Sequence, residues 1–225
     1  MIHIVIPAAG ASKRFVEQGY PVKALVDVLG KPMMQRVIEN VRPSVEHRVT
    51  VVSQVPLPGV DAEVVIAGRP TTGSVDSILL ADIRNGEPLL LVNQDQLVDL
   101  DVDRFMASAG HGAIATFRSN KPHHSYVTLD PDGIVDQIAE KQVISSDAVT
   151  GIYYFCNGGD FRHAAQRVLA DDRRVLGEFY VSTVIADMVA AGCLFTTTDC
   201  ATAILGTPEE LQLFLAAVRV AQVAL

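Results

Sequence analysis

The chain has 225 residues, 49% of them hydrophobic, which is enough to bury one sizeable core, so we expect a single domain over residues 1–225. Its 18 basic and 26 acidic residues give a net charge of −8, which argues against nucleic acid as the main partner but not against a nucleotide, because local cations decide that. The three cysteines lack a Cys-x-x-Cys spacing and no uninterrupted apolar run reaches about 18 residues, so we expect no zinc cluster, disulfide framework or membrane span, and a cytoplasmic protein.

The first predicted element is a buried strand over residues 2–6, which is rich in β-branched residues. After Pro7 comes a run of small residues, Ala8, Ala9, Gly10, Ala11 and Ser12, whose main chain can approach a ligand closely and bind an anion through its N–H groups. Lys13, Arg14 and Lys23 follow. Three cations around such a loop are typical of a polyphosphate site, whereas the loop alone is equally typical of a simple turn, and Lys23 alone of a solvated surface residue.

A helix over 33–41 and strands over 47–52 and 62–66 come next. Strand, helix and strand at this spacing predict a parallel α/β sheet with right-handed crossovers. The loop 68–74 then leads into a predicted helix from Ser74 to about Asn85. Its small residues either cap that helix or contact a nucleotide, and Gly73, Thr71 and Thr72 are the candidates for the second role.

Residues 89–92 predict a fully buried central strand, which leads directly to Asp95. Ligands of open α/β sheets lie at the carboxyl ends of strands, and a carboxylate there is well placed to bind Mg²⁺, although an Asp at this point is also a common turn or helix-cap residue. The acidic run Asp99, Asp101 and Asp103 is more typical of a solvated helix start, with Asp103 as the expected cap.

The second half of the chain predicts strands over 111–118, 126–129, 134–139, 148–155 and 194–198. Asp130-Pro131-Asp132-Gly133 is a turn signal, so the second and third of these strands form a hairpin that ends at Glu140-Lys141. His123 and His124 precede it without a spaced third metal ligand, so we expect a partly exposed, flexible pair. Helices are expected from Asp160, from Gly177 to about Ala191, and from Thr207, where Pro208 and Glu210 complete a capping box.

The segments AAGASKRF, VKAL and GKPMMQRVIENV resemble, in this order, the nucleotidyltransferase family that includes the sugar-1-phosphate pyrophosphorylases. The hairpin with its Glu-Lys pair and the segments VTGIYYF, GGDF and LGTPEEL extend the resemblance over most of the chain. It implies a Rossmann-like α/β fold of the nucleotide-diphospho-sugar transferase type, with a mixed, mostly parallel sheet flanked by helices and an acceptor-side hairpin around 121–141.

The resemblance also implies the activity: an NTP, marginally CTP, is coupled to a sugar 1-phosphate or another small phosphorylated precursor of a surface polysaccharide, with release of pyrophosphate and Mg²⁺ as cofactor. Arg14, Lys23 and Asp95 would be catalytic, and Asp95 would bind the metal. Nucleotide binding would fall to Ala8, Ala9, Gly10, Ala11, Ser12, Lys13, Thr71, Thr72 and Gly73. Acceptor binding would fall to Glu140, Lys141, Gly151 and Glu178.

Three positions depart from the family pattern: Ser12 replaces a loop glycine, Val22 separates Pro21 from Lys23, and Ile204 replaces a second metal-binding Asp. The last favours one Mg²⁺ at Asp95 over two, with Asp199 as a nearby candidate. Two other functions stay open: a glycosyltransferase core that uses an Asp-x-Asp motif within residues 99–103, and a nucleotide-binding subunit without activity. A homo-oligomer is also possible.

Overall fold

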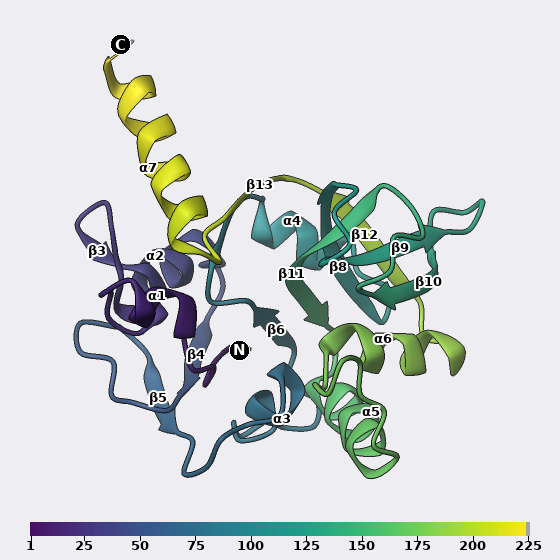
Figure 1. Ribbon diagram of the computed structural model, residues 1–225. Helices are drawn as coiled ribbons and strands as arrows, with labels where there is room; N and C mark the ends of the chain where they lie inside the picture. The colour runs from purple at the N-terminus through teal and green to yellow at the C-terminus, as the bar shows by residue number, and fades with distance from the viewer. Residues whose placement is uncertain (224–225) are drawn as a thin grey trace.

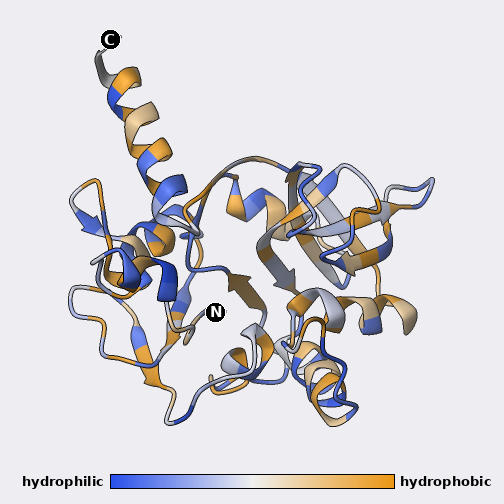
Figure 2. Cartoon of the chain, viewed as in Figure 1, coloured by the Kyte–Doolittle hydropathy of each residue, from blue (hydrophilic) through white to orange (hydrophobic). Residues whose placement is uncertain are grey.

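Two strands at the middle of the sheet show why this chain forms a layer that is buried on both faces. β1 (Ile2–Ala8) and β6 (Leu89–Val92) pair in parallel. On β6, Leu89 and Leu91 belong to one hydrophobic cluster, and Leu90 and Val92 belong to the other. Since successive side chains of a strand point to opposite faces, a strand that is apolar throughout must be covered on both sides. Figure 2 shows β6 as this apolar strand at the centre of the protein. The computed structural model describes residues 1–223.

The central sheet has nine strands, and β10 and β11 run against the direction of the others. The predicted mixed, mostly parallel sheet is therefore confirmed. Along its main path lie β10 (Val135–Glu140), β9 (Ser125–Leu129), β11 (Asp147–Phe155), β6, β1, β4 (His47–Ser53) and β5 (Glu63–Ile66). β8 (Gly112–Arg118) pairs with β11, and β12 (Phe195–Asp199) pairs with β8.

Helices cover both faces of this sheet (Figure 1). α2 and α4 pack on one face, and α3, α5 and α6 pack on the other. The helices are α1 (Lys13–Glu17), the 3₁₀ helix η1 (Lys23–Leu25), α2 (Met33–Asn40), α3 (Ser74–Ile78), α4 (Val102–Ala107), α5 (Gly158–Ala170), α6 (Val181–Ala190) and α7 (Pro208–Val223). Within residues 1–223, none of them has the length and apolar character needed to cross a bilayer.

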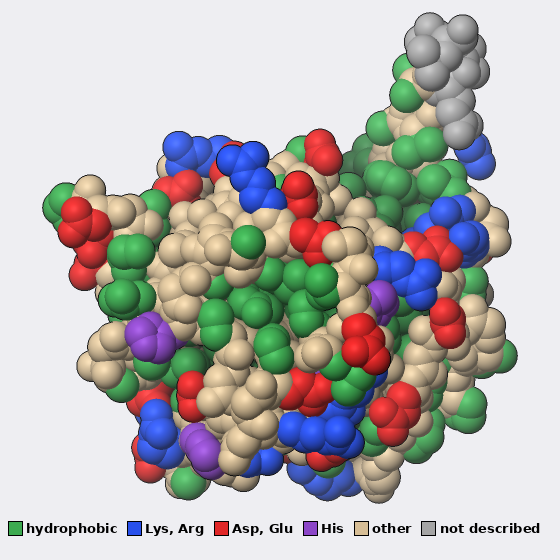
Figure 3. Space-filling model, turned by 180° about the vertical axis from the view of Figure 1, so that it is seen from behind, with side chains coloured by type: hydrophobic (Ala, Val, Ile, Leu, Met, Phe, Trp, Pro, Cys, Tyr) green, Lys and Arg blue, Asp and Glu red, His purple; other side chains and the backbone are tan. Residues whose placement is uncertain are grey.

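A third, smaller hydrophobic cluster joins the two ends of the chain. Phe15 of α1 packs there with Leu205, which precedes α7, and with Leu211 near the amino-terminal end of α7. Two short sheets lie nearby: β2 (Asp27–Val28) pairs with β3 (Lys31–Pro32), and β7 (Gln96–Asp99) pairs with β13 (Ala201–Ile204). α7 projects from the body of the protein (Figure 3). Its side chains Leu213 and Val220 are both 71% exposed.

Two predicted helices are wrong at their boundaries, in each case because of hydrogen bonds to distant parts of the chain. α3 ends at Ile78 rather than near Asn85. The carbonyls of Asp82 and Ile83 accept from the side chains of Arg48 and Arg162 and so are not used within a helix. α6 begins at Val181 rather than at Gly177, because the preceding Phe179 is bonded through its main chain to the loop before α3.

Two predicted helix caps are also wrong by a few residues. Asn157, not Asp160, caps α5, where its side chain accepts from the N–H of Gly159. Asp101, not Asp103, caps α4 through the N–H of Arg104. The Asp103 carboxylate instead accepts from the N–H of Ser44 at 3.1 Å. In both helices a suitable side chain lies two or three residues earlier than expected, and sequence alone does not choose between neighbouring caps.

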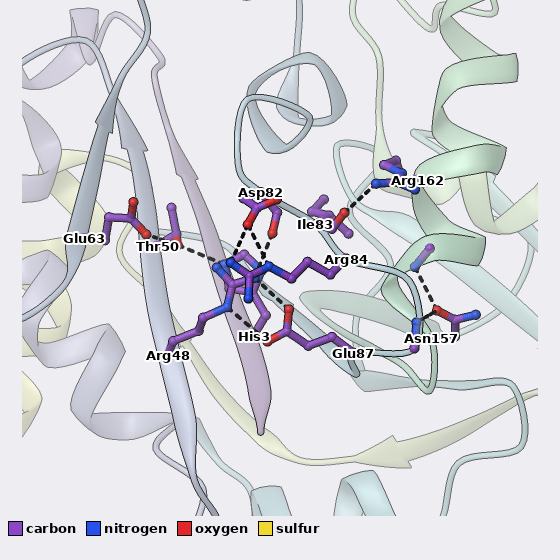
Figure 4. A network of polar contacts seen from close by, with 12 residues as sticks. His3, Arg48, Thr50, Glu63, Asp82, Ile83, Arg84, Glu87, Asn157 and Arg162 are labelled. Carbon is purple, nitrogen blue, oxygen red and sulfur yellow. Dashed lines mark hydrogen bonds and ion pairs between the residues drawn. The ribbon is translucent and has the colours of Figure 1, made fainter.

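A polar network around His3 joins the amino-terminal part of β1 to its neighbours (Figure 4). The Nε2 atom of His3 lies 2.9 Å from the hydroxyl of Thr50, which donates to a carboxylate oxygen of Glu63. Thr50 therefore accepts from His3, and the imidazole is neutral with its proton on Nε2. Beside it, Arg48 forms a two-pronged ion pair with Glu87. Burial, followed by the charge of Arg48, lowers the pKa of His3 to about 4.

The buried His3 should make the protein less stable in mild acid. An unfolded histidine has a pKa of about 6.5, so the unfolded state binds the proton first as the pH falls. Above pH ~6.5 the histidine is neutral in both states and does not affect the free energy of unfolding. Between pH ~6.5 and about 4, protonation of the unfolded state lowers that free energy, by up to about 3 kcal/mol in all. In urea unfolding at pH 7 and 4.5, His3→Gln should lose less stability on acidification than the wild type. His163→Gln, at an exposed position, is the control, and equal pH dependence in all three proteins would contradict the assignment.

Candidate active site

The loop after β1 is fixed by Ser12, which has a φ of 50°, in the left-handed region. Its carbonyl accepts from the N–H groups of Phe15 and Val16 at the start of α1. Its hydroxyl oxygen accepts from the main-chain N–H of Lys23 at 3.0 Å. The residue that departs from the family's glycine thus forms a side-chain to main-chain bond that ties the loop to η1.

Lys23 and Asp95 form an ion pair at the centre of the site. The ammonium of Lys23 lies 2.8 Å from Oδ2 of Asp95, and the side chains are only 16% and 19% exposed. Asp95 comes shortly after β6, and its carbonyl accepts from the N–H of Leu205 at 2.7 Å. Residues that lie far apart in sequence are therefore joined at the carboxyl end of the central strand, the usual ligand-binding edge of an open α/β sheet.

Three cavities meet at this ion pair, and we name each after the part of the ligands that the sequence resemblance implies for its residues. The largest, of about 560 Å³, is called the acceptor cleft below, and its lining includes Arg14, Lys23, Ser74, Asn93, Asp95, Gln96, Glu140, Lys141, Gly151, Tyr153, Tyr180, Ile204, Thr207 and Glu210. A phosphate-side cavity of about 390 Å³ is lined by Ala11, Ser12, Lys13, Arg14, Phe15, Lys23, Glu178 and Gly206. A base-side cavity of about 260 Å³ is lined by Pro7, Ala9, Gly10, Thr71, Gly73, Ser74, Ser77, Asn93, Gln94, Asp95 and Glu178.

The loop before α3 is organised by Asp76. The carboxylate accepts two bonds from Arg69, at 2.6 and 2.8 Å, and further bonds from the N–H and the hydroxyl of Thr72. These bonds, that from Arg69 above all, lower the pKa of Asp76 to about 2. Thr71 takes part differently, because its hydroxyl accepts from Ser77 and it lines the base-side cavity.

Gly73 brings this loop into contact with the segment before α6. It has a φ of 126°, and a Cβ atom there would lie 2.5 Å from the main-chain nitrogen and oxygen of Phe179. The N–H of Phe179 donates to the carbonyl of Thr72 at 2.9 Å. Only glycine allows the two backbones to approach so closely, and this contact holds the loop before α3 against residues 178–180.

At the far end of the acceptor cleft, Glu140 and Lys141 lie next to hydroxyl groups. Glu140 Oε2 accepts from Ser125 and, at 2.6 Å, from Ser182. Lys141 donates to the hydroxyl of Tyr180 and lies 4.3 Å from the centre of its ring. A cation, a carboxylate and aromatic side chains in one cleft can bind a molecule that carries both a phosphate and hydroxyl groups.

Gly151 and the two histidines complete the cleft. A Cβ atom on Gly151 would lie 2.1 Å from the amide nitrogen of Asn93, so the missing side chain makes room for that amide. His123 is exposed, as expected, and its ring contacts that of the half-buried His124, with the two rings tilted by 56°. Burial, followed by the charge of His123, lowers the pKa of His124 to about 4, so this ring is neutral at physiological pH.

The structure brings most of the predicted site residues to the cavities where we expected them, but three of these residues lie elsewhere. The Thr72 side chain contacts Asp76, and Thr72 does not line any of the three cavities. Ala8 lines none of the three but a fourth cavity of about 60 Å³, between the loop and the end of β4. Glu178, expected on the acceptor side, lines the phosphate-side and base-side cavities.

Several residues that line the cleft were not predicted as site residues from the sequence. Asn93 and Gln96 flank Asp95 and could have been found from their place at the strand end. Tyr180 lies two residues after Glu178 and has no motif of its own. Thr207 caps α7 as predicted, since its hydroxyl accepts from the N–H of Glu210, and Thr207 and Glu210 both line the cleft as well.

The acidic run 99–103 lies outside the lining of the acceptor cleft. Asp99 is exposed at the end of β7, and Asp101 and Asp103 are used for helix capping and for the contact with Ser44. Asp199 is exposed on β12 and is absent from the cleft lining too. The Asp-x-Asp hypothesis therefore has no support from the geometry of the described residues.

Comparisons with known proteins identify the family and the fold. Residues 4–149 match the model of the MobA-like NTP transferase domain. The chain is similar to the crystal structure of a nucleoside-diphosphate-sugar pyrophosphorylase from Vibrio cholerae RC9, with a TM-score of 0.78, 20% identity and coverage of 95% of this chain and 99% of the other. It is also similar to a putative glucose-1-phosphate thymidylyltransferase from Bacillus anthracis, with a TM-score of 0.80, 16% identity and coverage of 97% and 96%.

A comparison with curated protein sequences finds no match. The family model covers well over half of the 225 residues, including the loop after β1, Lys23 and Asp95. The chain therefore belongs to the MobA-like NTP transferase domain family and is a nucleotidyltransferase.

Proposed function

We propose that the protein transfers a nucleotidyl group from an NTP to a small phosphorylated acceptor and releases pyrophosphate. The observation that carries this proposal is the Lys23–Asp95 pair at the point where the acceptor cleft meets the phosphate-side and base-side cavities. A triphosphate lying across that point would have its base beside Gly73 and its acceptor beside Lys141. We propose residues 1–225 as one unit for this reaction, with residues 121–141 on the acceptor side.

The reaction needs positioning and charge neutralisation more than proton transfer. An oxygen of the acceptor phosphate attacks the α-phosphorus in line, the new O–P bond forms, and the bond from the α-phosphorus to the bridging oxygen breaks with pyrophosphate as leaving group. Lys13 and Arg14 would bind the β- and γ-phosphates, and Lys23 would neutralise the α-phosphoryl oxygens. The acceptor phosphate is already ionised, so no general base is required.

The donor atoms fit a magnesium ion that is held jointly with the nucleotide. Among residues 1–223, no group of three or more His, Cys, Asp or Glu residues is suited to hold a metal. Asp95 Oδ2 and Glu210 Oε2, however, lie 3.3 and 3.2 Å from the point where a Cβ of Gly206 would be. Mg²⁺ typically binds to one or two carboxylates, with phosphate oxygens and water completing its shell. Asp95 would hold the ion, which neutralises phosphate charge when bound.

For the acceptor we propose a sugar 1-phosphate, in keeping with the hydroxyl-lined Glu140 and Lys141 and with the names of the two similar structures. Use as a precursor of a surface polysaccharide and the choice of CTP rest on the sequence resemblance alone. A homo-oligomer stays a prediction.

A screen for pyrophosphate release tests the proposal. CTP, UTP, dTTP, ATP and GTP are each combined with Mg²⁺ and with phosphorylated sugars, phosphorylated polyols and phosphorylated amino-acid derivatives. We expect release that depends on both an NTP and one class of acceptor. Nucleotide binding without release on the whole panel would favour the inactive-subunit alternative, and transfer from a sugar nucleotide would favour the glycosyltransferase alternative.

A further inference from the structure

The segment before α6 contacts both halves of the site. Gly73 and Phe179 form a β-bridge. The carbonyl of Phe179 also accepts from two residues of α3, the N–H of Val75 and, at 3.3 Å, the hydroxyl of Ser74. In Figure 1 this connection from α5 to α6 lies beside α3. The residues on either side of Phe179 point to different cavities, because Glu178 lines the base-side and phosphate-side cavities and Tyr180 lines the acceptor cleft.

The hydroxyl of Tyr180 lies between two opposite charges. It accepts from the ammonium of Lys141 and donates to Oε2 of Glu178 at 2.5 Å. Lys141 is also held against the Tyr180 ring, 4.3 Å from its centre. The hydroxyl is thus the polar group that separates the acceptor-side cation from the nucleotide-side carboxylate.

The chemistry of tyrosine suits this position. Burial and the neighbouring Glu178 raise the pKa of Tyr180, so its hydroxyl stays protonated and can accept and donate at the same time. Without the hydroxyl, Lys141 and Glu178 would attract each other directly across the gap. A direct pair would use up the lysine charge and draw the ammonium towards the nucleotide side, away from the acceptor cleft.

We propose that Tyr180 is a positioning residue that keeps Lys141 and Glu178 apart and holds the lysine ammonium ready for the acceptor phosphate. The inference rests on the proposed function only in taking the ligand of Lys141 to be a phosphate group. A purely structural tyrosine would also lower binding when replaced, but removal of the Glu178 charge would not correct that loss.

The test uses inorganic phosphate, the part that every proposed acceptor shares, titrated calorimetrically into the full chain. Lys141→Ala defines how much of the binding depends on the lysine. Tyr180→Phe keeps the ring and its contact with Lys141, and it should raise the Kd of the Lys141-dependent binding about tenfold, since the phosphate must then compete with Glu178. The double variant Tyr180→Phe/Glu178→Gln should restore the Kd to within about threefold of the wild type.

Tyr20→Phe is the matched control, because it also removes a tyrosine hydroxyl, here one that accepts from Gln212, outside the cleft. It should leave phosphate binding unchanged. Three outcomes would overturn the inference: wild-type affinity in Tyr180→Phe, a double variant as weak as the single one, or no Lys141-dependent phosphate binding at all. The proposed function fails by a different measurement, the absence of pyrophosphate release, so the two are separable.

Discussion

Replacing Lys23 by methionine should lower kcat/KM for nucleotidyl transfer by about 10³-fold while the protein stays folded. Methionine keeps most of the apolar stem and removes the ammonium that would neutralise charge on the α-phosphoryl group, and a stabilising group of this kind is typically worth 10²–10³-fold or more. Pyrophosphate release measures the loss. Circular dichroism and a melting curve establish the fold, and we expect Tm to change by less than about 4 °C, because Asp95 lines the cleft, where water can solvate its carboxylate once the ammonium is removed.

Lys31→Met is the matched control for Lys23. Lys31 is a second lysine paired with a carboxylate, Glu39, at 2.7 Å, but its side chain is 45% exposed and it is absent from the cavities of the site. Its replacement should leave kcat/KM within about twofold, as expected for a surface ion pair. Equal effects of the two substitutions would show that Lys23 has no special role in the reaction.

Asp95→Asn should lower kcat/KM by about 10²-fold or more and should remove the effect of Mg²⁺ on nucleotide affinity. The amide is a weaker magnesium ligand than the carboxylate and carries no charge to balance Lys23. The Kd of CTP is measured with and without Mg²⁺ in the wild type and the variant. We expect a marked difference only in the wild type.

Asp99→Asn separates this assignment from the glycosyltransferase alternative. Asp99 is an exposed carboxylate four residues further on, at the end of β7, and belongs to the Asp-x-Asp pattern. Its replacement should change neither the rate nor the magnesium effect. Loss of the magnesium effect in Asp99→Asn together with its retention in Asp95→Asn would move the metal site to the acidic run.

The central layer of the fold could be predicted from the sequence because its signal is local. β6 is apolar on both faces, and the turn at Asp130–Gly133 defines the β9–β10 hairpin. The helix expected over 33–41 forms α2, with Met33, Met34, Val37 and Ile38 buried. Such periodicity predicts an element correctly because burial of its apolar face is what stabilises that element.

The wrong boundaries have non-local causes. Arg48 and Arg162 occupy carbonyls after α3, and Phe179 pairs with Gly73, more than 100 residues earlier. The short pair β7 and β13 was missed for the same reason, since each strand is only four residues long and depends on the other. No window of neighbouring residues contains that information.

For the site, motif residues at strand ends could be located, but their neighbours across the cleft could not. The loop after β1, Lys23 and Asp95 lie together as the pattern indicates. The position of Glu178 in the lining of the cavity beside Gly73 follows from the Gly73–Phe179 contact, which only the folded chain reveals. The positioning role proposed for Tyr180 depends on its two charged neighbours, so it cannot be seen from the place of Tyr180 in the sequence.

The ion pair between Lys23 and Asp95 has a consequence for how ligands enter. Each partner occupies the place of the other's ligand: the ammonium lies where a cation would meet the carboxylate, and the carboxylate lies where an anion would meet the ammonium. A metal ion alone must displace the lysine, and a free nucleotide alone must displace the aspartate. Arriving together, the two satisfy both charges at once, so their binding should be positively cooperative, each raising the affinity for the other by the same factor.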